Sequence, residues 1–82
     1  MNIMKTLPDN NPYKEKLMRI LAILHHQIGL EKEDEILVVF QLNMEEKVIE
    51  FIEWIRQNLV NDKLQATPQE VMNKTSQISK KS

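Results

Sequence analysis

Apolar side chains recur at intervals of three and four residues between Pro12 and Ile28, which is the spacing of one helical face. The stripe consists of Tyr13, Leu17, Ile20, Leu21, Leu24 and Ile28. Asn11 is a preferred residue at a helix start, and Pro12 is preferred at the first helical position. Gly29 follows the stripe, as glycine commonly does just after a helix end. The pattern predicts a helix over residues 12–28.

Two further stretches show helical spacing. Met44, Val48, Ile52, Ile55 and Leu59 form one stripe, and Val71, Met72, Thr75 and Ile78 form a thinner one. Asn43 and Glu46 stand at capping-box spacing before the first stripe, and Thr67 and Glu70 do so before the second, where Pro68 takes the first helical position. These signals predict helices over residues 44–60 and 68–79, followed by a frayed tail at 79–82.

Residues 31–42, EKEDEILVVFQL, allow two interpretations. In a strand, alternate apolar residues would line one face, and their β-branched and aromatic character fits. In a helix, the acidic residues would occupy the first turn, where the helix dipole favours them, and apolar residues would surround nearly the whole cylinder, which requires burial on all sides. A lone strand would need a partner, either near Ile3 to Leu7 or in a second copy of the chain. We favour a helix over 31–42 and keep a strand over 35–42, in an α+β fold, as the alternative.

Together these elements predict an all-α fold, a compact array of three to four short helices in a single domain spanning residues 1–82. Residues 1–11 show no sustained periodicity and are predicted to form an extended N-terminal arm. The sequence contains one glycine and three prolines, too few for a fold rich in β-hairpins. A single core in a chain of this size rarely contributes more than roughly 3–5 kcal/mol, and oligomerisation is a common supplement.

The composition limits the cellular compartment and the kinds of site that we expect for this protein. Its longest apolar run, residues 36–40, is too short to span a bilayer, and no secretion signal is visible. The absence of cysteine excludes disulfides and thiolate metal sites. We therefore expect a cytoplasmic protein without a membrane segment.

Charge is distributed unevenly along the chain. Residues 1–30 carry four basic and two acidic side chains, residues 31–53 carry two and eight, and residues 54–82 carry five and two. Glu46, Glu50 and Glu53 share the outer face of the third predicted helix, and like charges at such spacing slightly destabilise a helix. This acidic ridge is either a solvated face or a surface for a basic partner.

Candidate catalytic and ligand-binding groups are few. His25 and His26 are neighbours, and neighbouring helical residues point about 100° apart, so the two would not hold one ion from within a helix. Imidazolium groups are favourable near a helix C-terminus, which gives both histidines a structural interpretation. The sequence shows no Ser/His/Asp set and no glycine-rich phosphate loop. It predicts no enzyme activity, no cofactor and no metal.

Apolar surface exceeds what one-sided helix packing uses. On the third predicted helix the apolar arc covers about 240°, whereas a surface helix needs little more than about 100°. The first predicted helix repeats this excess outside its stripe. We therefore predict a non-catalytic interaction or regulatory module that forms a homodimer or docks on a protein partner. The interface candidates are Phe51, Trp54, Ile23, Met18 and Ile49. Trp54 is either an edge of the core or, with Phe51, an interface anchor.

A helix-turn-helix regulator is the alternative. The third and fourth predicted helices would form the motif, and the last would present Gln69, Asn73, Lys74 and Gln77 to DNA. The pI of about 6.1 and the acidic ridge disfavour contact with phosphates. The connection between these helices is also longer than the usual tight turn. Nucleic acid is thus the less favoured partner.

Overall fold

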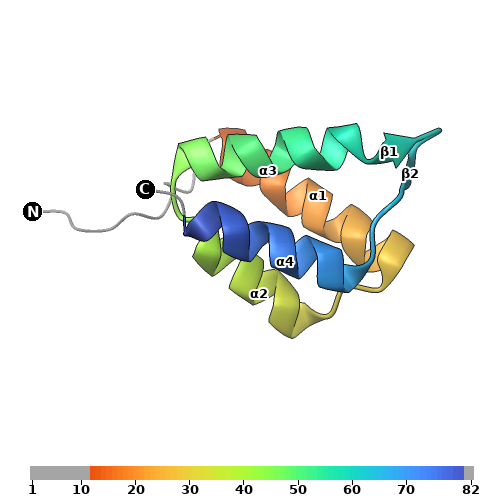
Figure 1. Ribbon diagram of the computed structural model, residues 1–82, viewed down its shortest axis with the longest axis horizontal. Helices are drawn as coiled ribbons and strands as arrows, with labels where there is room; N and C mark the ends of the chain where they lie inside the picture. Colours follow the sequence, from red (N-terminus) through yellow and green to blue (C-terminus); the bar gives the residue numbers. More distant parts are fainter. Residues whose placement is uncertain (1–11, 81–82) are drawn as a thin grey trace, which may run out of the picture.

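The computed structural model describes residues 12–80. It contains helices α1 (Pro12–Ile28), α2 (Lys32–Gln41), α3 (Glu45–Gln57) and α4 (Pro68–Ser79), with a short hairpin of β1 (Leu59–Val60) and β2 (Lys63–Leu64) (Figure 1). The prediction of a small all-α array is confirmed. The predicted arm at residues 1–11 and the end of the predicted tail at 81–82 lie outside the described residues.

Helix α1 has the predicted bounds, and its C-terminus is formed by Gly29. This glycine has a φ of 70°, in the left-handed region. Its amide donates to the carbonyl of His25 at 3.1 Å, and the amide of Leu30 donates to the carbonyl of Leu24 at 3.3 Å. These bonds satisfy carbonyls at the helix end and turn the chain toward α2.

Residues 32–41 form α2, so the helical interpretation of this segment is confirmed and the strand alternative is wrong. A helix satisfies its backbone hydrogen bonds internally, whereas no described strand pairs with residues 35–42. Glu33, Asp34 and Glu35 occupy its first turn, where the dipole favours them. However, Val38 is the buried residue of α2, and the expected burial on all sides is absent.

Helix α3 starts and ends differently from the prediction. Met44, not Asn43, is its N-cap, and no side chain caps the first turn, so the proposed capping box at Asn43 and Glu46 is wrong. The helix ends at Gln57 because the next residues turn into the hairpin. Asn61 and Asp62 both have positive φ, 54° and 65°, as a two-residue type I′ turn requires.

Helix α4 begins with the capping box predicted from the sequence. The amide of Glu70 donates to the Thr67 hydroxyl at 3.1 Å, and the amide of Thr67 donates to the Glu70 carboxylate at 2.8 Å. Two backbone donors at the helix start are satisfied in this way. The helix ends at Ser79, as predicted.

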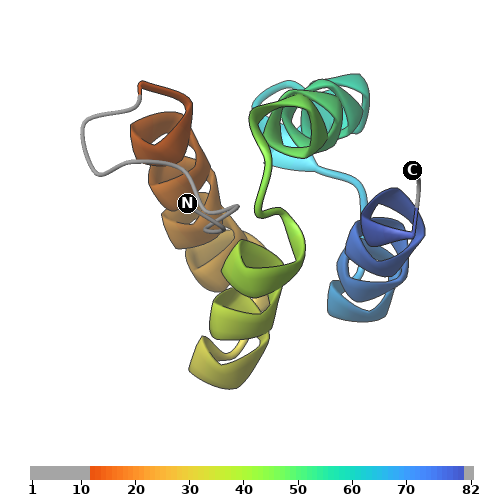
Figure 2. The ribbon, with the colours of Figure 1, turned by 90° about the vertical axis from the view of Figure 1, so that its left-hand side faces the viewer.

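The four helices pack around one core. Helix α1 contacts α3, α3 contacts α4, and α4 contacts α2. Figure 2 shows α1 and α4 on opposite sides, with α3 above and α2 below between them. The buried hydrophobic side chains come from all four helices and from Leu30, Leu42 and Leu64. This packing leaves the outer side of α2 and the adjoining side of α1 uncovered.

Candidate functional site: an apolar surface on α1 and α2

Helix α2 carries large apolar side chains on two opposite faces. Val38 is fully buried, whereas Phe40 is 72 % exposed and Ile36 is 61 % exposed. At about 100° per residue, Ile36 and Phe40 each lie about 160° away from Val38 around the helix. Leu37 adds a third exposed apolar side chain between these faces. One face of α2 therefore joins the core while the other presents hydrophobic groups to the surroundings.

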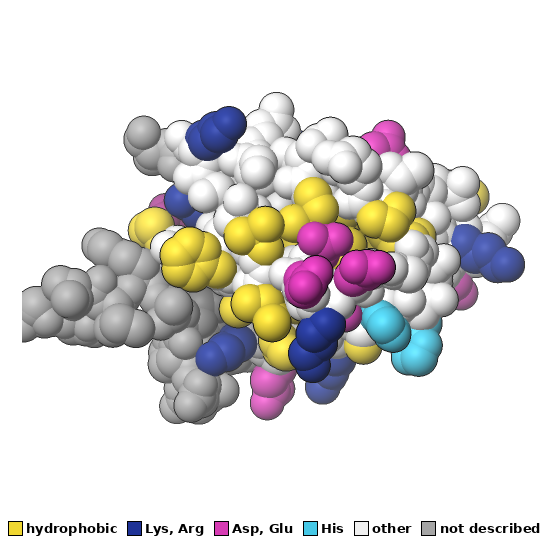
Figure 3. All heavy atoms as spheres, turned by 90° about the horizontal axis from the view of Figure 1, so that it is seen from below, with side chains coloured by type: hydrophobic (Ala, Val, Ile, Leu, Met, Phe, Trp, Pro, Cys, Tyr) yellow, Lys and Arg dark blue, Asp and Glu magenta, His cyan; other side chains and the backbone are white. Residues whose placement is uncertain are grey.

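An apolar groove of about 440 Å³ runs between α1 and α2. Met18 and Leu21 line it from α1, and Ile36, Val39 and Phe40 line it from α2. Its charged lining residues are Lys14, Lys32 and Glu35. We call this groove, together with the exposed side chains of Met18, Ile36 and Phe40 that line it, the α1–α2 surface. Figure 3 shows hydrophobic side chains gathered on this side of the molecule, with acidic and basic groups beside them.

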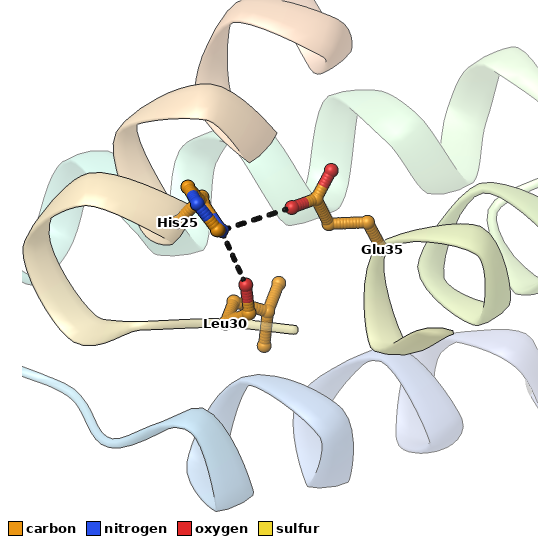
Figure 4. Close-up of polar contacts among 3 residues, drawn as sticks. All are labelled: His25, Leu30 and Glu35. Carbon is orange, nitrogen blue, oxygen red and sulfur yellow. Dashed lines mark hydrogen bonds and ion pairs between the residues drawn. The ribbon is translucent and has the colours of Figure 1, made fainter. Parts of the chain in front are cut away.

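His25 contacts Glu35, one of the residues that line the groove (Figure 4). Its Nδ1 lies 2.9 Å from the carbonyl oxygen of Leu30 and 3.6 Å from a carboxylate oxygen of Glu35. These contacts tie the C-terminus of α1 to the loop and to the start of α2.

The histidines show no metal-site geometry. The rings of His25 and His26 meet edge to face with centroids 5.7 Å apart. Within residues 12–80, no group of three or more His, Asp or Glu side chains is placed to hold a metal ion. The contacts of His25 with Leu30 and Glu35 therefore support its structural interpretation.

The interface residues predicted from α3 lie mostly inward. Phe51, one of the predicted interface candidates, is fully buried in the core. Trp54 is half-buried and packs against the core, and its ring stacks on that of Phe51. Ile49 is also half-buried. The apolar arc of α3 is wide because α1 and α4 both pack against this helix.

The two candidates on α1 are exposed but belong to different grooves. Met18 is 50 % exposed and lies in the α1–α2 groove. Ile23 is 41 % exposed and lines a smaller groove of about 190 Å³ between α1, α3 and the hairpin, with Leu59 and Arg56. The interface candidates predicted from the sequence therefore include one residue of the larger surface, Met18, and omit Ile36 and Phe40. The sequence feature that could have indicated Ile36 and Phe40 is the presence of apolar residues on all sides of α2. The same feature also fits a helix that is buried on all sides, which is how it is interpreted in the sequence analysis.

The acidic ridge is only partly a solvent-facing row. Glu46 and Glu53 are exposed, whereas Glu50 is half-buried and interacts with other groups. Lys47 crosses from the same helix to donate to the carbonyl of Ser79 at the end of α4, at 2.9 Å. The ridge therefore borders the contact between α3 and α4.

The proposed DNA-contacting residues interact with one another along α4. Gln69 donates to the side-chain oxygen of Asn73 at 2.9 Å, and Lys74 donates to that of Gln77 at 3.2 Å. The hairpin separates α3 from α4, so the two helices lack the tight turn of a helix-turn-helix motif. This arrangement gives no support to the DNA-binding alternative.

Among the described helices, none is both long enough and apolar enough to cross a bilayer. Comparison of the chain with models of protein families, with curated proteins and with solved structures finds no match in any of the three.

Proposed function

We propose that this chain is a small, non-catalytic helical interaction module that binds a protein through the α1–α2 surface. The observation that carries the proposal is the exposure of Phe40 and Ile36, 72 % and 61 %, beside an apolar groove. Contiguous exposed apolar patches on small domains mark binding surfaces, whereas scattered apolar residues need no explanation.

The composition of the surface favours a protein over a lipid partner. Interfacial membrane helices are rich in Lys and Arg on their polar face. Helix α2 has a single basic residue, Lys32, beside Glu33, Asp34 and Glu35 in its first turn, and so carries a net negative charge. Anionic lipid headgroups would be repelled by such a helix.

The arrangement of polar and apolar groups also resembles that of protein interfaces. Met18, Ile36 and Phe40 form an apolar centre, and Lys14, Lys32 and Glu35 lie among the charged groups around it. Interfaces commonly combine an apolar core that includes aromatic residues with a polar rim. The groove is lined almost entirely by hydrocarbon, which favours burial of an apolar side chain.

Site-specific photocross-linking tests this function. A photoreactive phenylalanine derivative at position 40 of the full chain should give a discrete cross-linked protein product in cells that make it. The same group at Glu53, an exposed position on α3, is the matched control. Equal and diffuse labelling from both positions would contradict the proposal.

A further inference from the structure

Building on the proposed function, we infer that the occupant of the α1–α2 surface is a second copy of this chain. The two copies would be related by a two-fold axis near Ile36 and Phe40, with their α2 helices antiparallel. Phe40 of each copy would enter the groove of the other. The inference combines the shape of the surface, its charge distribution and the limited size of the domain.

Shape provides the first argument. A two-fold interface uses the same patch on both copies, so that patch must complement itself. Phe40 projects from α2 at 72 % exposure, directly beside a groove lined by Met18, Leu21 and Val39. Each copy therefore offers both a projecting aromatic side chain and an apolar space of about 440 Å³ to receive one. Aromatic anchors in apolar pockets are the usual centres of binding energy.

Charge provides the second argument and sets the orientation. The contact between His25 and Glu35 places the acidic first turn of α2 beside the C-terminal part of α1. Lys14 lies eleven residues before His25 on α1, roughly 16 Å along the helix, and so at the opposite end of the surface. Antiparallel copies bring each Lys14 toward the acidic turn of the other copy. Parallel copies would instead place the two acidic turns together.

Size provides the third argument and bounds the affinity. Helix α2 has ten residues and is therefore roughly 15 Å long. Two such surfaces bury an area at the low end of specific interfaces, below about 1,200 Å² in total, where associations are weak. We therefore expect a dimer with a dissociation constant in the micromolar range. Association would add to the limited stability of a core of this size.

Sedimentation equilibrium of the full chain, from about 1 µM to 1 mM, tests the inference. The native chain should pass from monomer to dimer across this range. Phe40→Glu should weaken association at least tenfold, because it places a carboxylate in the apolar groove. Its melting temperature at low concentration should match that of the native monomer, since residue 40 is largely exposed.

A charge exchange tests the orientation. Lys14→Glu and Glu33→Lys should each weaken association by a factor of about three to ten, because each homodimer then holds two like-charged pairs at its rim. In an equimolar mixture of these variants both pairs have opposite signs, and association should return to near the native level. Glu53→Lys, a charge reversal of the same size on α3, should leave association unchanged.

Other results of these experiments would overturn the dimer, its antiparallel arrangement or the proposed function. A strict monomer at 1 mM, or a dimer indifferent to Phe40→Glu, overturns the inference. A dimer that the mixture does not restore overturns the antiparallel arrangement. If the purified chain is monomeric while the cross-linker at residue 40 joins a different protein, the second copy is excluded and the proposed function stands. A cross-link from residue 40 only to residues 1–11 of the same molecule overturns both the proposed function and the second copy as occupant.

Discussion

The rings of Phe51 and Trp54 stack with their centroids 6.2 Å apart and their planes at 26°. Phe51 is fully buried, so the stacked tryptophan extends the core toward the surface. We expect Trp54→Ala to lower the free energy of unfolding by about 2 kcal/mol, less than the loss for a fully buried aromatic residue. Chemical denaturation at low protein concentration measures this loss.

Trp54→Phe is the matched variant, because it keeps an aromatic ring over Phe51. It should retain most of the stability lost in Trp54→Ala. Both variants should dimerise as the native chain does once they are folded. A loss of association without a loss of monomer stability would return Trp54 to the role of an interface anchor.

Val38 and Phe40 allow a comparison of the two faces of one helix. Phe40→Gln should change the free energy of unfolding of the monomer by less than about 0.5 kcal/mol, because the ring makes few contacts. Val38→Ala should cost about 2 kcal/mol, because the missing methyl groups leave a cavity in a closed core. Urea denaturation of both variants at a concentration that keeps them monomeric measures the difference. A loss of stability in Phe40→Gln equal to that in Val38→Ala would show that Phe40 has a structural role.

The capping box at Thr67 should contribute measurably to stability. Thr67→Ala removes the hydroxyl that accepts from the amide of Glu70, and we expect a loss of about 1 kcal/mol. Thr67→Ser keeps this acceptor and should restore the native value in thermal denaturation. Equal destabilisation by both variants would assign the effect to the lost methyl group of Thr67 and not to capping.

Elements with strong local signals were predictable from the sequence. Helices α1 and α4 have the expected bounds because each combines a regular apolar stripe with a marked end, Gly29 for α1 and Thr67 for α4. The hairpin was missed because its strands are two residues long and its turn, Asn61 and Asp62, lacks the glycine that marks most type I′ turns. The start of α3 was misplaced because a suitable residue type at position 43 does not ensure capping geometry.

The candidate surface was only partly predictable. An apolar excess is visible in the sequence, but periodicity does not show which helix faces the core on several sides. Helix α3 packs against both α1 and α4, so most of its wide apolar arc, including Phe51, is covered. Helix α2 packs mainly against α4 and leaves Ile36 and Phe40 exposed. This difference follows from tertiary arrangement, which local patterns do not specify.

Gln27 connects α1 to the hairpin and should control its local stability. Its side-chain amide donates to the carbonyl of Asp62 at 2.9 Å, and its side-chain oxygen accepts from the amide of Leu64 at 2.7 Å. Gln27→Ala removes both bonds, so the Leu64 amide should exchange with solvent about tenfold faster, as expected for the loss of about 1.4 kcal/mol of local protection. Gln27→Glu retains the acceptor for Leu64 and loses the donor to Asp62, so it should protect the Leu64 amide better than alanine does. Hydrogen exchange followed residue by residue makes the comparison, with the amide of Val71 in α4 as an internal reference that should not change. Equal acceleration at Leu64 and Val71 would mean that Gln27 stabilises the whole fold and not the hairpin alone.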